Sequence, residues 1–237
     1  MSIIDNLLVL LDDEKERTLD EIIRSFSEYS RQVISASLGR MASKKLIKKN
    51  KRSKTYLIDN KGQKLITETL NNLGKFENPN ESNVCHFVLF NIPEKERVNR
   101  DIMRNYLSTN GFGRLHNTVW ISTTCNIDNL KKIIASLNIL DKSLLFSSDI
   151  TRDNMESIIK FSTWDFDKLN KGYREFIKLS ESFLKSKNKD SLYARCVVYL
   201  FAKSASLDPK LPAKLINQKY LGNEAYAIYK KIRKFCY

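Results

Sequence analysis

Eight lysine and arginine residues are gathered between Arg40 and Lys54, in a stretch that contains no acidic residue. Clustered cations favour binding to a nucleic acid, because neutralised phosphates release counterions and this release drives association. The residues around the cluster predict the elements that carry it. Apolar residues recur there at spacings of three and four, which is typical of one buried helix face: Val33, Ile34, Leu38 and Met41.

Two short β-type segments follow this helix, at residues 46–49 and 55–58, and a basic tip at residues 50–54 joins them. A helix followed by a basic hairpin is typical of a winged helix. In that fold the helix enters the major groove of DNA, and the hairpin reaches an adjacent groove or the backbone. The sequence therefore predicts a winged helix-turn-helix whose partner is double-stranded DNA.

The first half of the predicted recognition helix carries the candidates for base contact, Arg31, Gln32 and Ser35. Arginine can form two hydrogen bonds with guanine, and glutamine can do so with adenine. Phosphate contacts position a protein without reading the sequence. A solvated surface is the alternative for every one of these residues. The residues expected to contact phosphates, including the wing tip, are Arg40, Lys44, Lys45, Lys48, Lys49, Lys51, Arg52 and Lys54.

Residues 1–74 contain the other elements of this first domain. Apolar spacing predicts a helix over residues 3–11, and Thr18 with Glu21 forms a capping-box pattern that opens a second helix. A further helix is expected over residues 61–73, ending at Gly74. The N-terminal domain is thus expected to fold as helices followed by a wing and one more helix.

The rest of the chain predicts a linker and two more domains. Residues 75–83 are polar and are expected to form the linker. In residues 84–151 the patterns follow the order strand, helix, strand, strand, helix, strand, which is typical of a ferredoxin-like domain. Residues 152–237 are expected to form a helical domain, in which the segment from Asp208 to Pro212 breaks the helix. The fold class is therefore α+β.

Charge is distributed unevenly over these domains. Residues 1–75 carry 15 basic and 10 acidic residues, residues 76–151 carry 8 of each, and residues 152–237 carry 18 basic and 9 acidic residues. A neutral middle does not repel a second copy of itself, so the central domain is the expected dimerisation surface. A two-fold dimer would bind the two halves of a palindromic operator.

Three segments together resemble the PaaX-type repressor family, which is known for the control of phenylacetate breakdown. They show a strand ending in Pro-Glu-x-x-Arg, a Gly-Phe-Gly turn, a Val-Trp-Ile strand, a Trp-Asp helix start and Asp-Pro-x-Leu-Pro, in the family's order. The segments span nearly the whole chain: FNIPEKERVNRDIMRNYLSTNGFGRLHNTVWIS, WDFDKLNKGYREFI and DPKLPAKLI.

This resemblance implies a winged helix, a central domain similar to the small CRISPR adaptation nuclease, and a C-terminal helical domain. It also implies a homodimeric repressor that an acyl-CoA releases from DNA, phenylacetyl-CoA in the best-known members. No motif in this chain identifies phenylacetate, so the effector stays unknown. Arginine matches phosphate geometry, which makes Arg174 and Arg195 the candidates for an anionic effector, with packing or surface roles as the alternative.

Two other functions compete with a regulator. A metal-dependent nuclease on the central domain would need an Asp at the end of its first strand, where this chain has Asn91, and a neutral amide is a poor magnesium ligand. Asp101, Asp149 and His116 do not form an acid–base pair by their spacing. A non-specific nucleic-acid-binding protein is the second alternative. We expect no enzyme activity.

The remaining residues indicate neither a cofactor nor a metal. The four cysteines are widely spaced and only two histidines occur, so no zinc-binding pattern exists, and buried thiols in a reducing cytoplasm are expected. The start of the chain lacks the features of a signal peptide or membrane span. A cytoplasmic protein is therefore expected.

Overall fold

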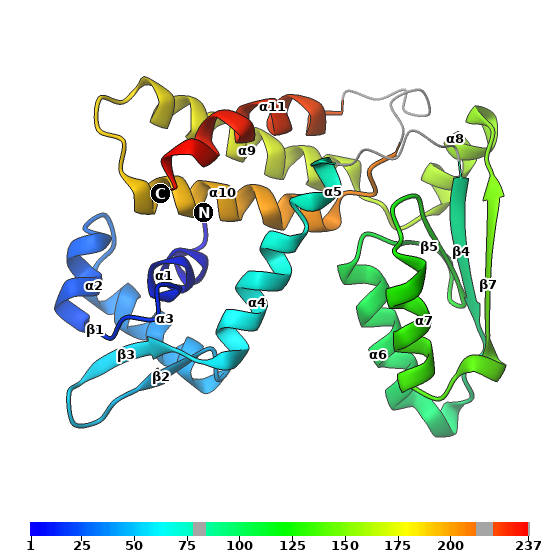
Figure 1. Ribbon diagram of the computed structural model, residues 1–237, viewed down its shortest axis with the longest axis horizontal. Coiled ribbons are helices and arrows are strands. Elements are labelled where there is room, and N and C mark those ends of the chain that lie inside the picture. Colours follow the sequence, from blue (N-terminus) through cyan, green and yellow to red (C-terminus); the bar gives the residue numbers. More distant parts are fainter. Residues whose placement is uncertain (78–83, 212–219, 237) are drawn as a thin grey trace. The chain divides into compact units, whose positions relative to one another are not determined.

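The computed structural model describes residues 1–77, 84–211 and 220–236. Its helices and strands form two compact units, each with one antiparallel sheet (Figure 1). Unit 1 comprises residues 1–73, 174–203 and 224–237, and unit 2 comprises residues 74–173 and 204–223. The expected mixture of α and β elements is confirmed.

Unit 1 begins with three helices, α1 (Ile3–Leu11), α2 (Leu19–Ser25) and α3 (Arg31–Ser43). The expected capping box is formed, because Glu21 N donates to the Thr18 hydroxyl at 3.3 Å and Thr18 N donates to the Glu21 carboxylate at 2.6 Å. These bonds satisfy N–H groups that the first turn of a helix leaves without a partner. The start of α2 is therefore fixed locally by two residues.

A three-stranded sheet with the order β1-β3-β2 follows these helices along the chain. β2 (Ile47–Lys49) and β3 (Thr55–Ile58) form the expected hairpin. β1 (Arg17–Thr18), a strand of two residues that the sequence did not reveal, pairs with β3. The hairpin leads into α4 (Asn60–Asn71).

Residues 1–77 depart from the sequence-based prediction in two places. Val33 is 42% exposed, so its placement on the buried face of α3 is wrong, whereas the polar Ser37 is fully buried there. Gly74 does not lie at the end of the preceding helix but begins a short one, α5 (Gly74–Glu77), inside the expected linker. The rest of that linker, residues 78–83, lies outside the described residues.

Three long helices contribute residues to both units: α9 (Phe166–Lys185), α10 (Ser191–Leu207) and α11 (Gly222–Ile232). They agree with the helical C-terminal region expected from the sequence. The short 3₁₀ helix η4 (Arg233–Phe235) follows α11. The break expected after α10 begins at Asp208, but Pro212 and the residues up to 219 lie outside the described part of the chain.

The core of unit 1 is built around α1, in which residues 6–11 are all buried. A helix that is apolar on every side must be covered on every side. Part of this cover comes from α10, since Cys196 and Tyr199 belong to the same core cluster as α1. The Arg195 guanidinium also donates to Val9 O at 2.8 Å, near the C-terminal end of α1, where a cation is favourable.

The sheet of unit 2 has the strand order β5-β6-β4-β7, and all of its neighbouring strands are antiparallel. Two helices connect the strands and cover one face of the sheet, where they form a core cluster with Val88 and Trp120 (Figure 1). In chain order the elements are β4 (Val84–Phe90), η1 (Glu94–Glu96), α6 (Arg97–Thr109), β5 (Gly113–His116), β6 (Val119–Ser122), α7 (Ile127–Ser136), η2 (Leu140–Lys142), β7 (Ser143–Asp149) and α8 (Arg152–Phe161).

Gly111 ends the helical segment before β5, as expected. Its φ of +80° lies in the left-handed region, which glycine adopts without steric cost. The two adjacent strands that the ferredoxin-like order requires between its helices are β5 and β6, and both lie within residues 112–123. Trp164, expected to begin a helix, lies two residues before α9, and its indole N–H donates to Gly111 O at 3.1 Å.

The opposite face of this sheet exposes apolar side chains. Phe87 of β4 and Phe146 of β7 are cross-strand neighbours, and their rings stack with centroids 4.8 Å apart. Phe146 is 43% exposed, and Leu144 of the same strand is 58% exposed. Side chains of one strand that are two residues apart share a face. Leu144 and Phe146 therefore form an exposed apolar patch on this face, on which Cys85 and Ile121 are buried.

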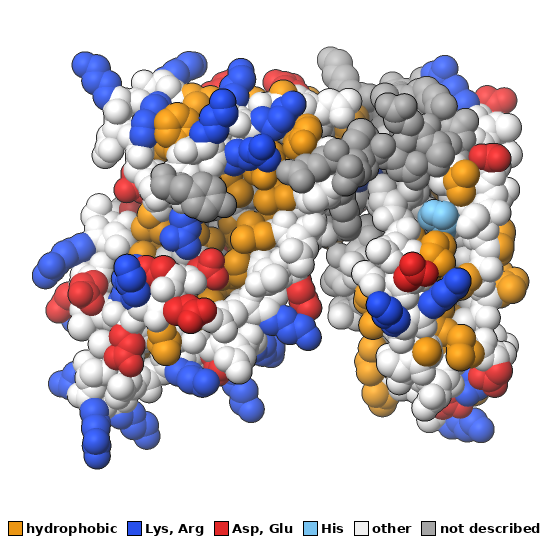
Figure 2. All heavy atoms as spheres, in the orientation of Figure 1, with side chains coloured by type: hydrophobic (Ala, Val, Ile, Leu, Met, Phe, Trp, Pro, Cys, Tyr) orange, Lys and Arg blue, Asp and Glu red, His pale blue; other side chains and the backbone are white. Residues whose placement is uncertain are grey.

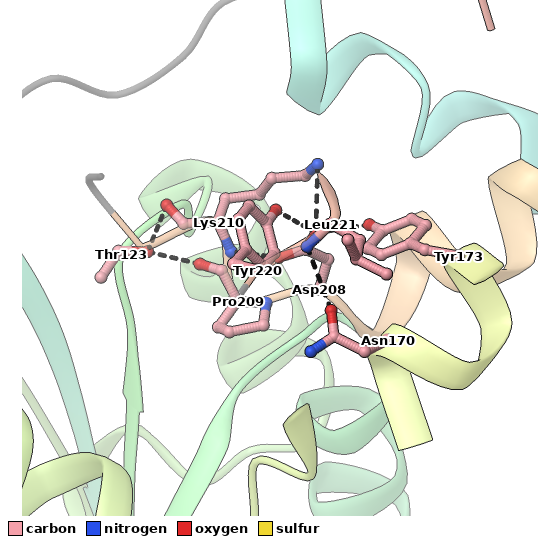
Figure 3. Close-up of polar contacts among 8 residues, drawn as sticks. All are labelled: Thr123, Asn170, Tyr173, Asp208, Pro209, Lys210, Tyr220 and Leu221. Atoms are coloured by element: carbon pink, nitrogen blue, oxygen red, sulfur yellow. Dashed lines mark hydrogen bonds and ion pairs between the residues drawn. The ribbon is translucent and has the colours of Figure 1, made fainter. Parts of the chain in front are cut away.

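A buried carboxylate, Asp208, joins separate segments of unit 2 (Figure 3). The hydroxyls of Tyr173 and Tyr220 donate to its Oδ2, and Lys210 N donates to its Oδ1 at 2.7 Å. The Lys210 ammonium lies 3.3 Å from Oδ2. Burial, together with the nearby Asp208 carboxylate, raises the pKa of both tyrosines, so that both hydroxyls stay protonated and donate.

We predict that Asp208→Asn lowers the free energy of unfolding of unit 2 by about 3–5 kcal/mol, because it leaves the Lys210 ammonium without its buried counter-charge. Both tryptophans, Trp120 and Trp164, lie in unit 2, so tryptophan fluorescence during urea unfolding reports on this unit. The control is Asp149→Asn at an exposed position of β7, which should change stability by about 0.5 kcal/mol or less. Equal stability of the two variants would contradict the prediction.

Candidate nucleic-acid interface

The N-terminal half of α3 is exposed where the sequence predicted base contacts. Ser30 caps the helix, since Val33 N donates to its hydroxyl at 3.4 Å. Arg31, Gln32 and Ser35 are all exposed, whereas Ile34 of the same turn is buried. The cap fixes the start of the helix, and the buried side chain fixes which side of it faces solvent.

Arg31 has an acidic neighbour at this surface. Its Nη1 lies 2.7 Å from Asp20 Oδ1 of α2, and the two side chains are 64% and 66% exposed. An ion pair this exposed contributes at most about 1 kcal/mol, because water screens it. The Arg31 guanidinium can therefore exchange this carboxylate for a guanine base or a phosphate at small cost.

Further residues of the exposed face of α3 were missed by the sequence analysis. Val33, Ala36 and Gly39 lie on the solvent side, next to Gln32 and Ser35. A Cβ added to Gly39 would meet no atom within 4 Å, so this glycine fills no tight contact inside the protein. Small side chains at these positions would let a helix lie close to a surface. The small residues Ser35, Ala36 and Gly39 could have identified this exposed face from the sequence.

The β2–β3 hairpin carries the basic tip that the sequence predicted as a wing. Lys51, Arg52 and Lys54 are exposed, and Lys54 has a left-handed φ of +55°. The turn is held by Asn50, whose side-chain oxygen accepts hydrogen bonds from Arg52 N at 3.0 Å and Ser53 N at 3.4 Å. Figure 2 shows Lys and Arg side chains gathered where Figure 1 draws this hairpin.

Glu16 supports the base of the wing and was also missed. Its carboxylate accepts hydrogen bonds from the hydroxyls of Thr55 at 2.6 Å and Ser53 at 3.4 Å. The hydrogen bond from Thr55 lowers the pKa of Glu16, because it favours the charged form. Its contribution to stability is therefore present above the ordinary pKa of a glutamate and is lost as the pH falls through the lowered value.

The other basic candidates differ in how firmly the protein holds them. Lys48 Nζ lies 2.9 Å from Asp59, and the Arg40 guanidinium donates to the Ser37 hydroxyl at 3.0 Å. Lys49 Nζ lies 5.5 Å from the centre of the Tyr56 ring. Lys44 and Lys45, at the end of α3, are exposed. The structure thus brings all eight basic residues to α3 and the adjoining hairpin.

The two candidates for an anionic effector lie in different settings. Arg174 of α9 is exposed. Arg195 of α10 is 29% exposed and lies 3.7 Å from Asp12, besides its hydrogen bond to Val9 O. Its guanidinium is already engaged with α1, which weighs against its use by a ligand.

The acidic residues considered for a nuclease do not converge. Asn91 follows the last residue of β4, whereas Asp149 pairs with Val84 at the other end of that strand. At about 3.3 Å per residue, the two ends of a seven-residue strand are roughly 20 Å apart. Asp101 lies on α6 and contacts Arg97 at 3.6 Å. Within the described part of the chain, no three His, Cys, Asp or Glu side chains gather as a metal site.

The whole chain is similar to one solved structure in particular. The uncharacterized protein Rv0674 from Mycobacterium tuberculosis is 15% identical to it, with a TM-score of 0.56, and the match covers 97% of this chain and 94% of that chain. At this identity the likeness concerns the fold. No curated protein matches the chain. In the described part of the chain, every helix is too short or too polar to span a bilayer.

Two family models match the chain in consecutive segments. Residues 82–158 match the PaaX protein central Cas2-like domain, and residues 164–237 match the PaaX-like protein C-terminal domain. Together they span well over half of the sequence and include the segments whose motifs resembled this family. The chain therefore belongs to the PaaX-type family of transcriptional regulators.

Proposed function

We propose that this protein is a sequence-specific DNA-binding transcriptional regulator, a homodimeric repressor that acts in the cytoplasm. The observation that carries the proposal is the exposed start of α3 beside a basic hairpin. Its helices and wing follow the order α1-β1-α2-α3-β2-β3, in which α3 would be the recognition helix of a winged helix-turn-helix. Membership of a regulator family supports the same conclusion.

In this proposal the residues of α3 and the wing have different tasks. Arg31, Gln32 and Ser35 would contact base edges in the major groove. The basic residues at the end of α3 and in the hairpin would contact phosphates and fix the register of the protein on the duplex. Glu16 and Asn50 would act indirectly, because they hold the hairpin that carries the wing tip.

We also propose that unit 2 dimerises through the open face of its sheet. Its strand order β5-β6-β4-β7, with helices on one face, fits a ferredoxin-like domain. The other face exposes Leu144 and Phe146, and residues 76–151 have no net charge, so a second copy would meet no repulsion. The resulting two-fold dimer would bind a palindromic operator.

An effector could release such a repressor only by binding the DNA-free form more tightly than the DNA-bound form. The resemblance implies an acyl-CoA-like molecule for this task, and exposed Arg174 is the candidate for its phosphates. The separation of Asn91 from Asp149 speaks against the nuclease alternative. A non-specific nucleic-acid-binding protein would show the same basic surface but no preferred sequence.

The experiment that tests this function is selection of bound fragments from random duplex DNA at about 150 mM salt, with magnesium present. We expect an enriched palindrome whose half-site spacing reflects a dimer. Intact DNA without enrichment would indicate a non-specific binder, and cut DNA would indicate a nuclease. Either of these outcomes would overturn the proposal.

We predict that Arg31→Ala and Gln32→Ala each weaken operator binding by about 1–3 kcal/mol and relax the preference at one base pair, because each removes a base contact. Competition binding against operator variants with single substitutions measures both effects. The matched control is Lys132→Ala on α7, an exposed lysine of unit 2. If the arginine and glutamine variants lose affinity for all sequences alike, α3 is not the recognition helix.

Lys51→Ala should weaken binding to every sequence by a similar factor and reduce the slope of log K against log salt by about one. The reason is that this lysine would neutralise one phosphate without touching a base. Fluorescence anisotropy over a series of salt concentrations gives the slope. An unchanged slope would place the wing tip away from the DNA.

Phe146→Asp is predicted to convert the dimer to a monomer, because it buries a carboxylate in the proposed apolar interface. Sedimentation of the full chain at micromolar concentration gives the oligomeric state. Val98→Asp on α6 is the control, since Val98 is 72% exposed yet lies outside the sheet face. Dimers that survive Phe146→Asp would locate the interface elsewhere.

A further inference from the structure

A cavity of about 530 Å³ lies in unit 1, beside the turn that leads into α3. Its walls come from α1, from the turn between α2 and α3, and from α9 and α10. A volume of this size suits a small organic ligand, for which pockets of about 300–1,000 Å³ are typical. No residue with an expected function lines it, so the cavity is separate from the proposed DNA interface.

Aromatic and apolar side chains form much of the cavity wall. Phe26 and Phe183 are buried, and Tyr29 and Tyr193 are partly buried. The buried thiol of Cys196 adds to the same wall. Flat rings on several sides favour a ligand with an aromatic body, because stacked and edge-on ring pairs stabilise such contacts.

One buried polar side chain belongs to the wall. Asn6 is only 3% exposed and lines the cavity. Burying an amide without a hydrogen bond destabilises the folded protein, so buried polar groups normally have one. A ligand that both accepts and donates hydrogen bonds would match this amide.

The charged side chains of the cavity are acidic. Glu28 and Asp190 line it, and no lysine or arginine is among the described residues that do so. The N-terminal ammonium of Met1 is already matched by Glu175, at 2.7 Å. The Glu28 and Asp190 carboxylates are both exposed, at the open side of the cavity. Burial raises the pKa of Tyr29, and the nearby Glu28 charge raises it further.

We propose that this cavity binds a small aromatic molecule that carries an ammonium group, with its ring between Phe26, Tyr29, Phe183 and Tyr193 and its cation near Glu28 and Asp190. Cations are favoured both by carboxylates and by the faces of aromatic rings. An anionic acyl-CoA would meet two carboxylates here, and the Met1 ammonium in the wall is already paired with Glu175. The cavity would therefore take a ligand of opposite charge to the one that the family resemblance implies.

The place of the cavity suggests how such a ligand would regulate the protein, a step that rests on the proposed function. Glu28 and Tyr29 belong to the turn that ends at Ser30, the cap of α3. A ligand that contacts this turn would favour one position of α3 over others. Its affinity would then differ between the DNA-free and DNA-bound forms, and DNA would change the affinity for the ligand by the same factor.

The test compares three probes that share one phenylethyl skeleton: 2-phenylethylamine, 2-phenylethanol and phenylacetate. Titration calorimetry with the full chain, in the absence of DNA, measures their affinities. We expect the amine to bind at least about tenfold more tightly than phenylacetate, with the alcohol between them. Equal or tighter binding of phenylacetate would overturn the proposal, and so would the absence of amine binding at millimolar concentration.

Substitutions in and near the cavity test whether the amine binds there. Ser182→Trp places a large ring in the cavity from an exposed position of α9 and should abolish amine binding, whereas Ser191→Trp, at an exposed position outside the cavity lining, should leave it unchanged. Glu28→Gln should bring the affinity for the amine down to about that for the alcohol. Unchanged amine binding in Ser182→Trp would overturn the assignment.

The same protein is then tested for operator binding without any probe. Failure of this binding would refute the proposed function and leave the calorimetric result untouched. If the operator binds, adding 2-phenylethylamine should change its dissociation constant in the wild type and not in Ser182→Trp. An equal effect on both proteins would refute the coupling.

Discussion

The burial of α1 is the constraint on which the structure of unit 1 depends. Residues 6–11 of this helix are all inside, so no side of it can face water. Helix α3 covers one part of it, and α10 covers another through Cys196 and Tyr199. The core of the N-terminal region is consequently not closed by residues 1–73 alone, because it includes a helix that lies nearly 200 positions further along the chain.

The sequence could predict the features that depend on neighbouring residues, but not those that depend on this shared core. The capping box at Thr18, the β2–β3 hairpin and the glycine stop at Gly111 depend on neighbouring residues, and all three are present. Val33 was misplaced because helical spacing gives the direction of the buried face but not its width. The contact of Arg195 with α1 joins residues 186 positions apart, and no local pattern encodes it.

The candidate site shows the same division between local and distant information. The basic residues of α3 and the wing were identified from clustering alone. Their acidic partners, Asp20 and Asp59, were not, and neither was Glu16, which accepts hydrogen bonds from Thr55 and Ser53 of the hairpin, because only the fold brings these residues together. The cavity could not be predicted either, since its lining residues come from two distant parts of the chain, residues 1–29 and 179–196. These acids lower the net positive charge of the surface that α3 and the hairpin expose.

The discontinuous make-up of unit 1 has a consequence for synthesis on the ribosome. Residues 1–73 emerge first, but the segments that complete their core, residues 174–203 and 224–237, emerge last. At about 5–20 residues per second, α1 would wait on the order of ten to forty seconds for α10. During that interval its apolar surface is open to other nascent chains and to chaperones. Maturation of the N-terminal region is therefore tied to completion of the polypeptide, and products of premature termination would lack the cover that α1 requires.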